Sequence, residues 1–204
     1  MGVSVSACMK GARPFKDNHE IHAFVASLRG KFSARDRAIA ALGLKTGSRI
    51  SQMLALRVGD VYHRGRFVER VYFKRSSRKG KIEGQSLPLH PALKMALGRW
   101  LVELRRKNGG LRPEDFLFPS RKGNRPIGRK AYWEIMHEAA DRAGLSRGIS
   151  PHSLRKSVAY KVYEKSGHDL LVTSRVLGHR SVLTTASYLG WGIDGRADSC
   201  VLSL

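Results

Sequence analysis

Apolar residues recur three and four positions apart along most of the chain, which is the spacing of one face of a helix. Ile21, Phe24 and Leu28 share one face of the first predicted helix, which Asp17 or Asn18 can cap. The same spacing, bounded by capping residues, prolines and glycines, predicts further helices. These extend from Ser33 to a weak end at Gly43 and Gly47, from Arg49, from Pro91 to about Lys107, and over residues 128–143, 151–165, 170–177 and 181–188.

Residues 61–90 follow a different pattern. β-branched and aromatic residues occur there in short runs, which is typical of strands, and Pro88 fits the edge of a sheet. The basic run at residues 74–81 has no acidic residue and is interpreted as the tip of a hairpin. We therefore predict an α+β fold that is mainly α, with helices around a small three-stranded antiparallel sheet.

The charge balance indicates a polyanionic partner. The 204 residues include 38 Lys and Arg against 16 Asp and Glu, a formal net charge of +22. Nucleic acid is the leading candidate, and an anionic membrane surface is the alternative. Apolar runs such as residues 39–44 are far shorter than the roughly 20 residues needed to span a bilayer, so no membrane segment is expected.

The cysteines and histidines do not suggest a redox or metal protein. Cys8 and Cys200 stand near opposite ends, which argues against a disulfide framework and a Cys-rich zinc site. His152, His168 and His179 lack the short spacing of zinc ligands. With no continuous apolar stretch at the amino terminus to act as a secretory signal, we expect a cytoplasmic protein without a bound metal.

Candidate chemistry involves two arginines, two histidines and a tyrosine. Arg49 and Arg155 stand near the starts of predicted helices, where free N–H groups favour an anion, and two guanidinium groups can bind one phosphate. His152 lies three positions before Arg155 and so shares its helix face. Tyr188 follows His179 by nine residues, and its phenol becomes a nucleophile where cations stabilise the phenolate.

Each of these residues taken alone has an ordinary structural explanation. Arg49 could be a solvated surface arginine, His152 could bond to backbone, His179 could belong to a turn, and Tyr188 could pack in the core. Their joint presence in a strongly basic chain favours a site that acts on a DNA phosphate.

Further basic residues are expected to contact the DNA backbone. These candidates are Lys74, Arg75, Arg78 and Lys81 in the hairpin, and Arg121 and Lys122 in a basic turn. One lysine at the hairpin tip could instead act as a proton donor, and Lys79 and Lys81 are both candidates.

Six motifs occur in order along the chain. They are Thr46-Gly47-Ser48-Arg49-Ile50-Ser51, Leu87-Pro88-Leu89, Phe116-Leu117-Phe118-Pro119, Pro151-His152-Ser153-Leu154-Arg155, Leu177-Gly178-His179 and Thr184-Thr185-Ala186-Ser187-Tyr188. With this set, from about Arg37 to Leu189, the sequence resembles the catalytic domain of the tyrosine recombinases, the phage integrase family. The resemblance implies the integrase catalytic fold.

The resemblance also implies roles for the matching residues. Arg49 and Arg155 would bind the scissile phosphate while Tyr188 attacks it, giving a 3′-phosphotyrosyl link and a free 5′-hydroxyl. His152 would accept a proton, and His179 would donate a hydrogen bond to the phosphate. No cofactor is then required, because the covalent intermediate conserves the energy of the phosphoester.

The resemblance leaves the hairpin lysine open. The family's lysine would fall at position 80, which is glycine here, between Lys79 and Lys81. Lys79 is preferred because it keeps the Lys-Gly order of the family. In either case the lysine would protonate the leaving 5′-oxygen.

We divide the chain into a flexible N-terminal arm at 1–16, a catalytic domain at 17–190 and a short C-terminal tail at 191–204, a candidate for docking on a neighbouring protomer. Family members usually have an amino-terminal core-binding domain that completes a clamp around DNA, whereas about 36 residues precede the matching region here. The resemblance implies a site-specific recombinase on double-stranded DNA in the nucleoid, as a homo-oligomer, a tetramer on two sites. An accessory DNA-binding protein is a candidate replacement for the clamp.

Two other hypotheses explain the charge. A non-catalytic DNA-binding regulator could place the helices between His152 and Tyr188 on a groove, like a helix-turn-helix module. It gives no reason for the full set of site residues. A basic RNA-binding protein is disfavoured because only 8% of residues are aromatic and no stacking motif is present.

Overall fold

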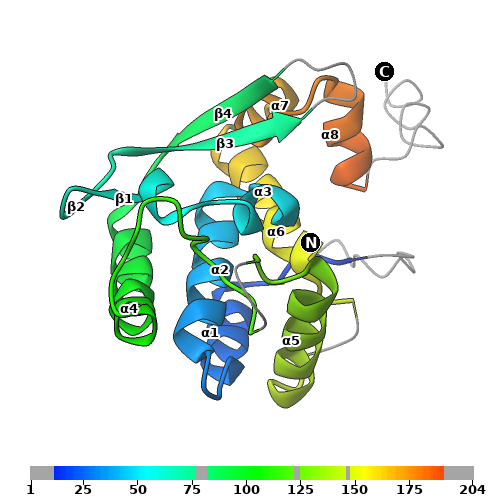
Figure 1. Ribbon diagram of the computed structural model, residues 1–204. Coiled ribbons are helices and arrows are strands. Elements are labelled where there is room, and N and C mark those ends of the chain that lie inside the picture. Colours follow the sequence, from blue (N-terminus) through cyan, green and yellow to red (C-terminus); the bar gives the residue numbers. More distant parts are fainter. Residues whose placement is uncertain (1–11, 77–81, 122–124, 146–147, 191–204) are drawn as a thin grey trace, which may run out of the picture.

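Helix α2 lies at the centre of the molecule, as the computed structural model in Figure 1 shows. The structure describes residues 12–76, 82–121, 125–145 and 148–190. Helix α1 (Asn18–Ser27) begins after Asp17, whose side chain accepts from the N–H of Glu20. Helix α2 (Ser33–Thr46) is buried along most of its length and packs on α4 (Pro91–Asn108) and α6 (Pro151–Lys165). Helix α5 (Arg129–Arg142) packs against α1.

Glycines shape α2 differently from the prediction. Gly47 ends the helix in a left-handed conformation with φ of 62°, but the helix continues past Gly43 to Thr46. Gly43 lies inside the helix where α6 approaches closely, because a Cβ atom there would stand 2.8 Å from Cδ1 of Leu154. The glycine therefore sets the distance between α2 and α6.

The strands form two ladders, not the predicted three-stranded sheet. Strand β1 (Tyr62–His63) pairs with β2 (Arg66–Phe67), and β3 (Arg70–Ser76) pairs with β4 (Ile82–Pro88), both antiparallel. The reason is that the chain bends at Glu69, between β2 and β3, and changes partner there. Strand β2 pairs with β1 and β3 with β4, so among the described residues no third strand lies beside β3 and β4. The mainly helical α+β architecture is confirmed.

The last helices build a small separate core. Helices α7 (Leu170–Leu177) and α8 (Val182–Tyr188) lie at the same end of the molecule as the β3–β4 hairpin in Figure 1. Ala159, Leu177 and Leu189 form an apolar cluster apart from the main core, and Tyr188 packs against it. Short elements α3 (Ile50–Leu54) and η1 (Val58–Asp60) follow α2.

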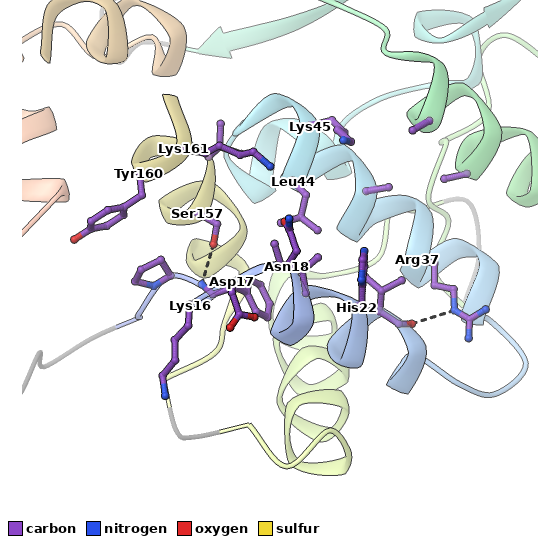
Figure 2. A pocket seen from close by; sticks show the side chains of 18 of the residues that line it. Lys16, Asp17, Asn18, His22, Arg37, Leu44, Lys45, Ser157, Tyr160 and Lys161 are labelled. Carbon is purple, nitrogen blue, oxygen red and sulfur yellow. Dashed lines mark hydrogen bonds between the residues drawn. The ribbon is translucent and has the colours of Figure 1, made fainter. Parts of the chain in front are cut away.

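The described part of the predicted flexible arm, residues 12–16, is packed against the molecule. Phe15 is 6% exposed, and its N–H donates to Oγ of Ser157 at 2.8 Å. Arg13 forms an ion pair with Glu20 at 2.7 Å. This segment borders a groove between α1, α2, α4 and α6, which Figure 2 shows from close by. Among the described residues no helix is long and apolar enough to cross a membrane.

Candidate active site

Arg155 is fixed at the centre of the candidate site by backbone carbonyl groups. It lies in the first turns of α6 and is only 3% exposed. Its guanidinium group donates to the carbonyl oxygen of Gly47 and, at 2.8 Å, to that of Leu177. These carbonyls lie at the carboxyl ends of α2 and α7, where the helix dipole favours a cation. One buried side chain thus joins three helices.

Arg49 begins α3 directly after the turn at Gly47. Its N–H donates to Oε1 of Gln52 at 3.3 Å, and Nε2 of Gln52 donates to the carbonyl oxygen of Lys74 in β3 at 3.2 Å. Gln52 therefore ties the start of α3 to the β3–β4 hairpin. Arg49 is half-buried, and its charge acts on both His152 and Tyr188.

Tyr188, at the end of α8, turns its ring toward α6. The ring centroid lies 5.9 Å from Cζ of Arg155 and 5.6 Å from Nζ of Lys156. Its buried Oη has no hydrogen bond of ordinary geometry among the described residues. Burial raises the pKa of the Tyr188 hydroxyl, while the positive charges of Arg155 and Arg49 oppose that rise. The phenol is therefore protonated at neutral pH and needs a proton acceptor in order to react.

His179 contacts Tyr188 edge-on, with ring centroids 5.6 Å apart and an interplanar angle of 74°. Its Nδ1 lies 2.8 Å from Oγ1 of Thr185, which fixes the ring on α8. The turn before it is held by Gln85 of β4, whose Nε2 donates to the carbonyl oxygen of Val176 at 2.5 Å. The hairpin is thus tied to the His179 segment as well as to the Arg49 segment.

His152 occupies the exposed first turn of α6. Partial desolvation of its ring lowers its pKa, and the nearby positive charges of Arg155, Lys156 and Arg49 lower it further. The imidazole is therefore neutral at pH 7 and able to accept a proton.

The structure thus brings the predicted residues Arg49, Arg155, His179 and Tyr188 together. His152 lies near enough for the charges of Arg155 and Arg49 to act on it. The hairpin residues Arg78, Lys79 and Lys81, and Lys122 of the basic turn, lie outside the described residues. Lys74 and Arg75 lie in β3, and the Lys74 side chain is exposed. Arg121 stacks on Phe32, with Cζ 5.3 Å from the ring centroid. Among the described residues no group of three or more His, Cys, Asp or Glu could hold a metal ion.

Sequence reasoning gave no site role to Lys156 or to the two glutamines Gln52 and Gln85. Lys156 could have been found, because it lies four positions after His152, and the helix-face rule that joined His152 to Arg155 includes it. Gln52 and Gln85 gave no such signal, since their partners are 22 and 91 residues away along the chain.

Comparison with known proteins identifies the family of this chain. Residues 15–190 match the model of the phage integrase family, so the chain belongs to that family. Tyrosine recombinase XerD of Mycobacterium leprae (strain TN) is 34% identical over 159 residues, which are 78% of this chain and 49% of that protein. Tyrosine recombinase XerD of Chlorobaculum tepidum is 33% identical over 77% of this chain and 49% of its own length. The chain spans about half the length of these curated relatives.

Solved structures show the same fold. The XerH site-specific recombinase, in a post-cleavage complex with a palindromic difH substrate, superposes with a TM-score of 0.67 at 26% identity, over 98% of this chain and 55% of that one. The XerA recombinase also gives a TM-score of 0.67, over 98% of this chain and 66% of that one. At 20% identity, this second likeness concerns the fold alone.

Proposed function

We propose that this chain is the catalytic part of a site-specific DNA recombinase that cuts and rejoins strands through a 3′-phosphotyrosyl intermediate. The observation that supports this most is the position of Tyr188, whose ring lies beside the buried guanidinium of Arg155 and touches the edge of His179. A DNA-binding regulator would have no use for a buried phenol among cations. Membership of the phage integrase family supports the same activity.

The proposed reaction is a transesterification between the Tyr188 hydroxyl and a phosphodiester of the DNA. Oη of Tyr188 forms a bond to phosphorus while the bond from phosphorus to the 5′-oxygen breaks. His152 takes the phenol proton, which its neutral imidazole is suited to accept. Arg49 and Arg155 stabilise the charge on the phosphate, with His179 as a further hydrogen-bond donor.

The leaving 5′-oxygen receives its proton from Lys79 or, as the alternative, Lys81. Gln52 and Gln85 tether the described part of the same hairpin to the two halves of the site. Rejoining reverses the steps, because the phosphotyrosyl ester retains the energy of the broken bond.

The partner in this proposal is double-stranded DNA, bound through backbone contacts that the net charge of +22 favours. The relative XerH was solved on a DNA substrate. The proposed assembly is a tetramer on two DNA sites in the nucleoid of the cytoplasm, with residues 191–204 docking on a neighbouring protomer. An accessory DNA-binding protein is a further partner in this proposal.

Trapping of the covalent adduct tests the proposed activity. The full chain is incubated with a nicked fragment library of DNA from its host, and protein joined to DNA is detected after denaturation. We expect an adduct with the unaltered chain and none with Tyr188→Phe, because only the phenol oxygen can form the ester. Tyr62→Phe, on the β1–β2 ladder, is the matched control and should keep the adduct.

Two results would count against the proposal. One is an adduct that persists in Tyr188→Phe with the fold unchanged by circular dichroism. The other is the absence of any adduct with the unaltered chain across the library. Sequencing the attachment points in a positive experiment would give the target site.

A further inference from the structure

Lys156 stands beside the proposed nucleophile without being one of the predicted site residues. Its Nζ lies 5.6 Å from the ring centroid of Tyr188, close to the 5.9 Å of the Arg155 guanidinium. The two cations come from consecutive positions of α6, so their side chains leave the helix in different directions. The aromatic ring therefore contacts α6 through two separate positive groups.

Lys156 has no acidic partner in the part of the chain that the structure describes. The half-buried lysine forms no ion pair with a carboxylate among the described residues, and Arg155 and Arg49 bring further positive charge to the same tyrosine. Burial also lowers the pKa of its ammonium group. The electron-rich face of the Tyr188 ring is therefore the group that attracts the Lys156 ammonium.

The attraction grows as the phenol reacts. Loss of the phenol proton places negative charge on Oη and on the ring, so a cation held over the ring binds the charged form more strongly than the neutral one. An interaction that is stronger along the reaction path than in the resting state accelerates the reaction. Lys156 meets this condition through its position over the ring.

We propose that Lys156 is a positioning residue whose ammonium group holds the Tyr188 ring in its attacking orientation and stabilises the phenolate as it forms. This inference rests on the proposed recombinase activity and adds to it a group from outside the predicted set.

A plain contact between Lys156 and the DNA backbone makes a different prediction. A phosphate contact contributes to affinity, so its loss would weaken DNA binding and would be overcome at saturating DNA. A cation over the nucleophile contributes to the cleavage step, so its loss would persist at saturation. Measuring binding and cleavage separately therefore distinguishes the two roles.

The experiment compares Lys156→Met, Lys156→Arg and the unaltered chain on one trapped DNA substrate. Methionine keeps the length and the apolar stem without the charge, whereas arginine keeps the cation over the ring. Lys161→Met is the matched control, because Lys161 is an exposed lysine on the same helix that lines the groove in Figure 2. The readouts are the dissociation constant and the single-turnover rate of adduct formation at saturating DNA.

We expect Lys156→Met to slow adduct formation about tenfold at saturating DNA, with little change in affinity, which is the size of effect that a partly buried cation–π contact supplies. Lys156→Arg should restore most of the rate, and Lys161→Met should keep all of it. An unaltered rate in a folded Lys156→Met, or a rate recovered at saturation, would overturn the inference alone. No adduct even with the unaltered chain would instead refute the proposed activity.

Discussion

The two histidines of the candidate site have different environments and so suit different tasks. His179 is held by Thr185 through Nδ1 and lies against the ring of Tyr188, so its position is fixed relative to the nucleophile. His152 is exposed on the first turn of α6 with cations on the neighbouring residues. Fixed geometry suits a hydrogen-bond donor, whereas a neutral, accessible imidazole suits a proton acceptor.

The environment of His152 predicts the pH dependence of adduct formation. Its pKa is lowered from 6.5, so the ring stays neutral at pH 7 and becomes protonated only below that ordinary value. We expect the single-turnover rate at saturating DNA to be level near pH 7 and to fall in acid below 6.5, as the acceptor is lost. His152→Gln should be roughly 100-fold slower at pH 7 and should lose this acid limb.

His137→Gln is the control for this measurement, because His137 is exposed on α5 and stacks on Trp133. It should keep both the rate and the acid limb. An acid limb that survives unchanged in His152→Gln would show that another group accepts the proton.

At the level of elements, the helices were predictable because their ends have local chemical causes. Asp17, Pro91 and Pro151 begin helices close to their predicted starts, and Gly178 ends α7 in a left-handed conformation. The strand pairing was not predictable in this way. The partners of β2 and β3 depend on contacts between residues that are distant along the chain. The same pattern of β-forming residues fits one three-stranded sheet or two separate ladders.

The sequence predicted which side chains the structure brings together, but not the contacts that hold them in place. The residue types of Arg49, His152, Arg155, His179 and Tyr188 indicate the chemistry, and the structure places them together. The carbonyl oxygens of Gly47 and Leu177 that hold Arg155 left no trace in the sequence, because any residue provides a carbonyl. The catalytic roles, and the choice between Lys79 and Lys81, stay predictions.

Gly43 and Gly98 both lie inside helices but differ in the space around them, so alanine should have opposite effects at the two positions. Gly43→Ala would place a Cβ 2.8 Å from Cδ1 of Leu154, so we expect the free energy of unfolding to fall by about 1–3 kcal/mol. Gly98→Ala in α4, where the nearest atom is 3.8 Å away on Phe67, should instead raise it by about 0.5–1 kcal/mol. Urea denaturation measures both, and a stabilised Gly43→Ala would contradict the packing described.

At the scale of the whole molecule, residues 12–16 belong to the folded unit. Phe15 packs against Phe24 of α1 with ring centroids 5.2 Å apart, and its backbone bonds to Ser157 of α6. The sequence did not predict this, because a single aromatic residue between basic and proline residues has no periodicity. The segment therefore links the first helix to the helix that contains Arg155.

Removal of this link should destabilise the entire fold. Phe15→Ala is expected to lower the free energy of unfolding by about 3–5 kcal/mol, the usual cost of deleting a buried phenylalanine side chain. Lys16→Ala, one position further on at an exposed residue, should change it by less than about 0.5 kcal/mol. A Phe15→Ala chain as stable as the unaltered one, measured by urea denaturation, would restore the flexible-arm interpretation.

The division of the apolar interior into one large cluster and one small one has a consequence for heating. The small cluster of Ala159, Leu177 and Leu189 holds Tyr188, and parts of a protein with few buried contacts open at lower cost than the whole. On warming, α8 should detach while α1, α2 and α4 are still intact. Thermal inactivation would then precede melting, and cooling would restore activity without any refolding of the main core.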